Sequence, residues 1–164
     1  MHMLKQPERI KTVIITGSLG LFENCMGDTY LKRGDKEYIR KKTELTFYDP
    51  AMATEELVNE VFEITNNRIK VIKIIALAKS AIRNNLGEEL KDIKQPTCLI
   101  WGNNDSITPP FVGKEFNNLI PNSELHIIDK CGHAPMMEVP EEFNQVLDAF
   151  LAKQKMPAAT VKQI

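Results

Sequence analysis

The stretch that decides the fold is Pro96-Thr97-Cys98-Leu99-Ile100-Trp101-Gly102-Asn103-Asn104-Asp105. Its apolar residues are consecutive, which is typical of a strand that is buried on both faces of a parallel sheet. The run stops at a glycine and is followed by one titratable side chain, Asp105. A second stretch, Ile127-Ile128-Asp129-Lys130-Cys131-Gly132-His133, has the same plan and ends at His133.

Asp105 and His133 each follow a predicted strand. In open parallel sheets, functional groups gather outside the carboxyl ends of the strands, so we expect these two side chains to lie close together. An aspartate that accepts a hydrogen bond from one imidazole nitrogen leaves the other nitrogen free to take a proton. Taken singly, Asp105 could shape a turn and His133 could cap a helix. Taken together, they predict two thirds of a nucleophile–base–acid triad.

The rest of the chain alternates strands and helices from the first strand onward. Strands are predicted over residues 12–16, 97–101 and 124–128. Helices are predicted over residues 38–47, 54–66, 68–84 and 110–119, and from Pro140 onward. Thr54 is the expected N-cap of its helix. This order predicts an α/β fold with about three parallel strands and flanking helices.

Residues from about 30 to 90 hold helices and no predicted strand. A lid over a pocket is one interpretation, and a crossover with additional helices is the other. Helix content alone leaves both open. From Lys153 the tail is polar, and we expect it to fray.

The composition excludes several classes of protein. The 164 residues include 21 Lys and Arg against 22 Asp and Glu, so the charge gives no reason to expect nucleic acid or an anionic membrane as partner. No apolar run approaches the roughly 20 residues that span a bilayer. The first eight residues lack the pattern of a signal peptide, so we expect a cytoplasmic protein.

Three cysteines, Cys25, Cys98 and Cys131, are far apart and lack CxxC spacing, which fits a reducing compartment. Cys98 lies in a strand-like run and is interpreted as a small buried apolar residue. Cys131 and His133, with His126 nearby, would need a fourth ligand to form a zinc site, and no residue supplies it. We therefore expect no metal and no cofactor.

Residues 96–109 and 132–143 together resemble the C-terminal part of the α/β-hydrolase fold family. The first segment is similar to the strand and loop that carry the triad acid, and the second is similar to the histidine loop. The resemblance implies that Asp105 orients His133, which acts as general base and then as general acid. Residues 7–18 are similar to the family segment that follows the nucleophile helix. The implied division is a partial core over 1–18 and 88–152, a helical cap over 19–87 and a polar tail over 153–164.

The nucleophile of this family sits on a Gly-x-Ser-x-Gly turn between a strand and a helix. None of the four serines in the chain has glycine at both −2 and +2. Ser18 comes nearest, with Gly20 at +2, but Thr16 stands at −2 and a loop follows. Cys25 lacks the turn as well. We therefore expect no nucleophile and no oxyanion-hole segment in this chain, which alone is predicted to be inactive.

Two hypotheses follow. The first is a hydrolase of an ester or related bond, represented by its C-terminal portion, whose full-length form acts on a small molecule. The second is a non-catalytic half-fold that self-associates or docks on a partner chain, because the strand over 12–16 would leave an unpaired edge. A homo-oligomer and a complementing N-terminal half are the partners considered. The substrate cannot be read. Five residues would line its pocket or form the cap core: Phe22, Met26, Tyr30, Phe47 and Tyr48.

Overall fold

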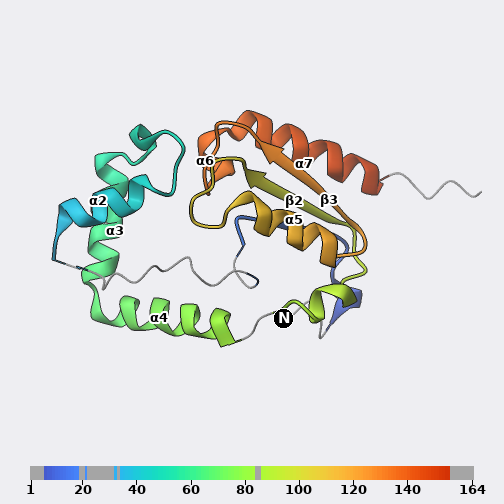
Figure 1. Cartoon of the computed structure of the whole chain (residues 1–164), viewed down its shortest axis with the longest axis horizontal. Helices are drawn as coiled ribbons and strands as arrows, with labels where there is room; N and C mark the ends of the chain where they lie inside the picture. Colours follow the sequence, from blue (N-terminus) through green and yellow to red (C-terminus); the bar gives the residue numbers. More distant parts are fainter. Residues whose placement is uncertain (1–5, 19–20, 22–31, 33, 84–85, 156–164) are drawn as a thin grey trace, which may run out of the picture.

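The computed structural model of the chain describes residues 6–18, 21, 32, 34–83 and 86–155. In this part of the chain, the strands β1 (Val13–Thr16), β2 (Thr97–Gly102) and β3 (Ser123–Ile128) form a parallel sheet in the order β1-β2-β3. Figure 1 shows the sheet with helices around it. The predicted α/β class and parallel sheet are confirmed.

The sheet lies between two helical layers. On one face, Leu99 and Trp101 of β2 pack with Val112 and Phe116 of α5 (Pro110–Leu119), and η4 (Glu89–Asp92) joins this cluster. On the other face, Cys98 and Ile100 pack with Phe150 of α7 (Pro140–Lys155). Every residue of β2 is buried, as the unbroken apolar run predicted. The central strand therefore anchors both layers.

β1 is less buried than β2. Ile14 is 37% exposed, and the other residues of the strand are partly buried. Within the described residues β1 pairs only with β2, so no strand forms backbone hydrogen bonds with its outer edge. The apolar sequence of β1 is suited to a central position, but in this chain the strand lies at an edge. Before β1, the described part of the chain forms a single 3-10 turn, η1 (Pro7–Arg9).

A helical segment, residues 34–83, connects the first two strands. It contains α2 (Lys36–Glu44), a 3-10 turn η3 (Pro50–Met52), α3 (Glu55–Asn66) and α4 (Arg68–Arg83). Asp35 caps α2 by accepting from the Tyr38 amide at 3.0 Å, and Thr54 caps α3 as predicted, accepting from the Leu57 amide at 3.2 Å. The cap at Asp35 starts α2 two residues before the predicted helix.

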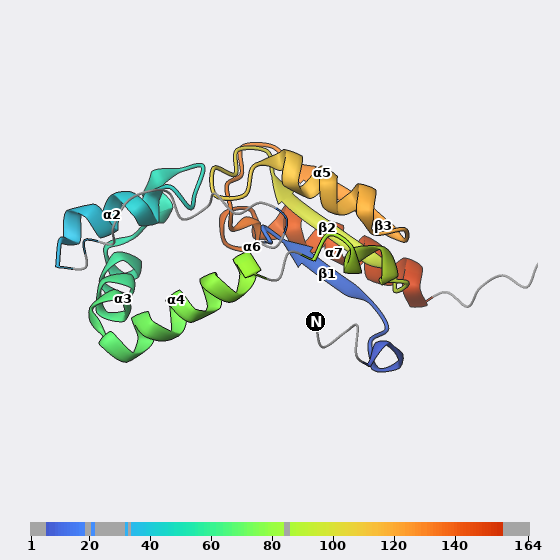
Figure 2. The same cartoon turned by 60° about the horizontal axis from the view of Figure 1, so that its bottom comes forward.

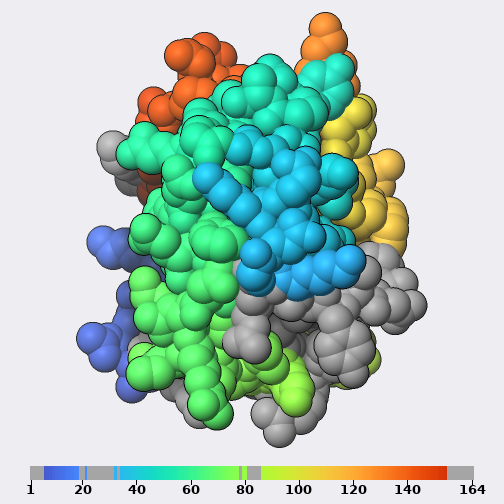
Figure 3. Space-filling model, turned by 90° about the vertical axis from the view of Figure 1, so that its left-hand side faces the viewer, coloured from blue at the N-terminus to red at the C-terminus, as the bar shows by residue number. Residues whose placement is uncertain are grey.

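Figures 1 and 2 show α2 and α3 beyond the carboxyl ends of β2 and β3, while α4 leads back toward η4. Glu55 of α3 binds Lys36 and Arg40 of α2. Figure 3 shows that α2, α3 and α4 together form this face of the molecule. The helical segment thus covers the end of the sheet where Asp105 and His133 emerge.

The C-terminal helix continues through Lys155, past the predicted start of the polar tail at Lys153. A short helix, α6 (Pro135–Glu138), precedes it. Among the described helices, none combines the length and the apolar content needed to cross a bilayer. The cytoplasmic location and the division into core and cap stay predictions.

Candidate active site

Asp105 and His133 meet as the sequence predicted. His133 Nδ1 lies 2.9 Å from Asp105 Oδ2. A carboxylate can only accept, so this contact requires the proton on Nδ1 and leaves Nε2 as the free acceptor. Asp105 is 3% exposed, whereas His133 is only partly buried. The pair therefore combines a fixed, water-excluded acid with a histidine that solvent or a substrate can reach.

The local sequence after β2 satisfies the rest of the Asp105 carboxylate. Oδ1 accepts from the amides of Ile107 and Thr108, both at 2.8 Å. Oδ2 also accepts from the Thr108 hydroxyl at 2.8 Å. Burial raises the pKa of Asp105, but the hydrogen bonds from His133 and Thr108 outweigh burial and hold this pKa below its ordinary value. Asp105 is therefore a carboxylate at neutral pH, able to stabilise an imidazolium.

The loop that carries Asp105 is fixed to the core and to the histidine loop. The Trp101 indole, fully buried, donates to the Thr108 carbonyl at 2.7 Å. The amides of Asn103 and Asn104 donate to the carbonyls of Ile128 and Cys131 at 2.8 and 2.9 Å. These backbone bonds hold the two loops side by side, so the Asp105–His133 contact does not depend on one side-chain interaction.

Glu138 joins the histidine loop to the helical segment. Its Oε1 accepts from the Gly132 amide at 2.8 Å, and its Oε2 accepts from the Tyr48 amide at 2.6 Å. The His133 amide donates to the Thr46 carbonyl at 2.7 Å, so a second bond joins the same two segments. Sequence reasoning placed Glu138 in the histidine motif but gave it no role.

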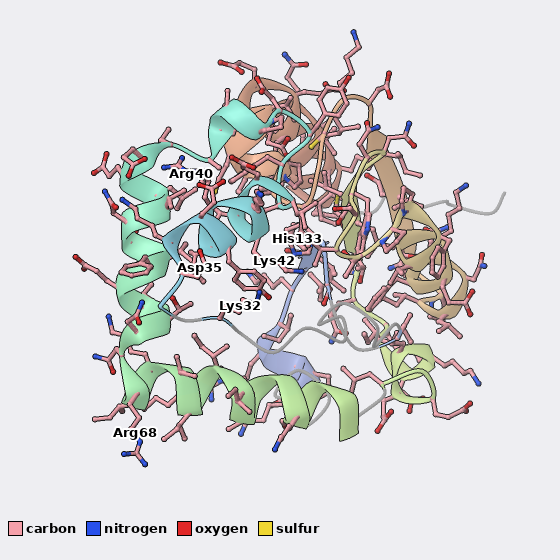
Figure 4. All side chains as sticks on the ribbon, turned by 60° about the vertical axis from the view of Figure 1, so that its left-hand side comes forward. Lys32, Asp35, Arg40, Lys42, Arg68 and His133 are labelled. Carbon is pink, nitrogen blue, oxygen red and sulfur yellow. The ribbon has the colours of Figure 1, made fainter. Side chains whose placement is uncertain are left out.

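The acid loop bonds to the same short connection. The Ser106 hydroxyl donates to the Leu45 carbonyl at 2.9 Å. Residues 45–48 therefore contact both the loop that carries Asp105 and the loop that carries His133. Figure 4 shows His133 where the sheet meets the helical segment, with the labelled Lys42 on α2. The helical segment is thus part of the support of the site.

Gly17, directly after β1, lies against the His133 ring. Its φ of +49° is in the left-handed region, and an added Cβ would lie 2.8 Å from His133 Cε1 and 2.9 Å from Nδ1. Sequence reasoning treated Gly17 only as the end of a strand. A glycine after a buried parallel strand was the signal that could have pointed to a close approach.

The remaining predicted residues have different outcomes. Phe47 is buried with Ala53 and Val58 of the helical segment and with Ala134 of the histidine loop, and Tyr48 is exposed. Ser18 follows Gly17 and is partly buried. Outside the described residues lie Phe22, Cys25, Met26 and Tyr30.

Cys131, for which the sequence offered no complete set of zinc ligands, is fully buried. Burial, and next the nearby Glu138 charge, raise the pKa of its thiol to about 12. Its sulfur lies 3.7 Å from the Gly132 carbonyl oxygen. Cys131 therefore behaves as a structural thiol.

Comparisons with known proteins identify the family of this chain. The family model described as the α/β hydrolase fold matches residues 15–140. A 2-hydroxy-6-oxononadienedioate/2-hydroxy-6-oxononatrienedioate hydrolase from a Pseudomonas species is 34% identical over 119 residues, which cover 71% of this chain and 42% of that protein. A hydrolase of the same name from Escherichia coli K12 is 29% identical over 168 residues, covering 92% of this chain and 57% of that protein.

A solved structure is similar as well. MGS-MChE2, an α/β hydrolase enzyme from the metagenome of lagoon sediments at Mar Chica, Morocco, is 38% identical with a TM-score of 0.68. The match covers 94% of this chain and 55% of that one. The chain therefore spans about half the length of the proteins it matches.

Proposed function

Because this chain belongs to the α/β-hydrolase fold family, we propose that it supplies the general base and its orienting acid to a hydrolase of the nucleophile–histidine–acid type. The substrate is a small molecule with an ester or related bond. The observation that carries this proposal is the 2.9 Å contact between His133 Nδ1 and Asp105 Oδ2, with Asp105 buried.

The proposed acid–base chemistry follows from the His133 tautomer, which has its proton on Nδ1 and a free acceptor at Nε2. As a nucleophile attacks the acyl carbon, His133 Nε2 accepts the nucleophile's proton. The Asp105 carboxylate stabilises the resulting imidazolium and does not itself become protonated. His133 then gives the proton to the leaving group, and the same cycle with water releases the acyl product. Asp105 and His133 are the catalytic residues of this chain.

The nucleophile comes from outside this chain, and the chain alone is inactive. Two observations support this part of the proposal. The sequence contains no Gly-x-Ser-x-Gly turn, and the chain spans 42% of the length of its Pseudomonas relative. Removing one triad member leaves only residual catalysis even when the rest of a site is intact.

A complementing half that carries the nucleophile is the partner we propose. The outer edge of β1 has no ladder within the described residues, and Ile14 is exposed there. On α4, five large apolar side chains are between 41% and 71% exposed: Ile69, Ile72, Ile74, Ile75 and Leu77. Such a helix face and strand edge are suited to burial against further protein. The helical segment is then a cap whose connection, residues 45–48, holds both catalytic loops.

The relatives suggest which bonds to test. Two of them are named as hydrolases of 2-hydroxy-6-oxononadienedioate and 2-hydroxy-6-oxononatrienedioate. A substrate panel therefore includes such a dienedioate beside an activated aryl ester. Turnover of the dienedioate would extend the proposal from an ester bond to a carbon–carbon bond.

Complementation tests the proposal. The chain is mixed with the part of the Pseudomonas relative that it does not match, and hydrolysis of the panel is followed. We expect turnover by the mixture and none by either part. His133→Ala should lower the rate of hydrolysis by a factor of at least about 1,000. His126→Ala, a change at a histidine outside the site, is the matched control and should leave the rate unchanged.

Three results would contradict the proposal. Turnover that survives His133→Ala would remove the histidine from the mechanism. Turnover by the chain alone that is lost in Ser18→Ala would place the nucleophile within it. A stable complex of the two parts that hydrolyses no member of the panel would favour the non-catalytic docking hypothesis.

A further inference from the structure

A second cluster of reactive side chains lies away from His133. Cys98 of β2 pairs in register with Glu124 of β3, and His126 follows two residues later on the same face of β3. The Cys98 sulfur, one Glu124 oxygen and one His126 ring nitrogen all lie within 4.8 Å of one another. Two neighbouring strands therefore bring three different metal-ligating groups together.

We propose that Cys98, Glu124 and His126 bind a zinc ion. Thiolate, imidazole and carboxylate are the three ligand types that zinc uses in proteins, at bond lengths of about 2.0–2.3 Å. Ligand atoms that are within 4.8 Å of one another need only small side-chain rotations to reach one ion. Three protein ligands leave the fourth tetrahedral position to water.

The burial of the three groups fits an ion that enters from the surface. Cys98 is fully buried, whereas the side chains of Glu124 and His126 are 34% and 37% exposed. Among the described residues, no hydrogen bond engages the Cys98 sulfur. The cluster therefore has a buried thiol, Cys98, and two ligands that solvent can reach, Glu124 and His126.

Without the metal, other contacts satisfy Glu124. Its Oε2 accepts from Lys153 Nζ of α7 at 2.7 Å, and its Oε1 lies 3.2 Å from His126 Nε2. The Lys153 ammonium thus forms an ion pair with the Glu124 carboxylate and would compete with a metal ion for it. Zinc would take over this carboxylate and release the lysine to solvent.

Binding also requires the Cys98 thiol to lose its proton. Burial and the nearby Glu124 charge raise the pKa of this thiol to about 11, so at neutral pH the S–H bond breaks as the zinc–sulfur bond forms. The proton leaves to the buffer, and no oxidant or reductant takes part.

The cluster lies in the first part of β2 and β3, whereas Asp105 and His133 follow the carboxyl ends of these strands. Zinc would cross-link the two strands at the end of the sheet away from the catalytic pair. The expected consequence is a more stable fold, because an ion that binds only the folded state stabilises it by mass action.

The test uses the full chain under reducing conditions, titrated with cobalt(II) chloride as a spectroscopic substitute for zinc. We expect a saturable near-ultraviolet band from cobalt–thiolate charge transfer, its displacement by zinc chloride, and a Tm that rises with zinc. Cys98→Ala should abolish the band. His126→Ala, a change at a partly exposed site, should weaken binding without unfolding the chain.

Matched variants make the test specific. Cys131→Ala and Cys25→Ala should keep the band, because neither residue belongs to the cluster. Lys153→Met should tighten binding several-fold by removing the competing cation, whereas Lys114→Met on α5 should not. The proposal is overturned if no band forms, if the band survives Cys98→Ala or is lost in Cys25→Ala, or if Lys153→Met leaves the affinity unchanged.

Discussion

Gly17 leaves the space that the His133 ring occupies: a Cβ at residue 17 would lie 2.8 Å from His133 Cε1 and 2.9 Å from Nδ1. The end of β1 and the loop after β3 therefore meet through a residue without a side chain. Since Nδ1 is also the atom that bonds Asp105, this contact bears directly on the Asp105–His133 pair.

Gly17→Ala is expected to displace the His133 ring from Asp105. The substitution adds a clash and places a side chain at a φ of +49°, so we expect a loss of about 1–3 kcal/mol in the free energy of unfolding. Urea unfolding measures this loss, and proton NMR measures loss of the low-field Nδ1–H signal. Gly34→Ala is the control, because nothing lies within 4 Å of its Cβ. Equal effects of the two substitutions would contradict the prediction.

Asp105→Asn should change how stability depends on pH. Because the folded-state pKa of Asp105 is depressed, its stabilising contribution is present above the unfolded value of about 3.9 and is lost as pH falls through the folded pKa. We therefore expect the stability of the variant not to fall in this way as the pH is lowered. At neutral pH its free energy of unfolding should be lower than that of the unmodified chain by about 1–3 kcal/mol. Urea unfolding from pH 3 to pH 7 measures both. An unchanged slope in the variant, with Asp148→Asn as control, would show that Asp105 is not the titrating group.

Thr108→Val should raise the pKa of Asp105, because it removes the hydroxyl that donates to Oδ2 at 2.8 Å. The shape of the buried side chain is nearly preserved, so the expected loss of stability is about 1–2 kcal/mol. Carbon-13 NMR titration of the Asp105 carboxyl measures the pKa. Thr108→Ser keeps the hydroxyl and should keep the low pKa; a rise in this variant too would assign the effect to packing.

Glu138→Gln should loosen the connection between the helical segment and the histidine loop. A neutral amide presents only one acceptor oxygen, so the amides of Tyr48 and Gly132 can no longer both be satisfied. Hydrogen exchange should accelerate at both amides, with a loss of about 1–3 kcal/mol in stability. Glu141→Gln, an exposed neighbour on α7, serves as the comparison. If both amides stay protected from hydrogen exchange in Glu138→Gln, then Glu138 does not connect the helical segment to the histidine loop.

The sequence alone located much of the site. The run over 97–101 predicted a strand buried on both faces, and Asp105 and His133 were identified as the side chains that follow two such runs. These inferences succeed because an unbroken apolar run and a terminating glycine are local features, and parallel sheets bring the carboxyl ends of their strands to one edge. Other features depend on long-range placement: the exposure of Ile14, the close approach of Gly17 and the two bonds of Glu138.

What the sequence by itself determined is therefore the class of fold, the family and the two side chains, Asp105 and His133, that meet at the candidate site. What only the tertiary structure decided is which distant segments support them. Tyr48 and Glu138 are 90 residues apart, and Cys98 of β2 lies beside His126 of β3. Such contacts are set by sheet order, register and loop packing, which no local pattern of residues encodes.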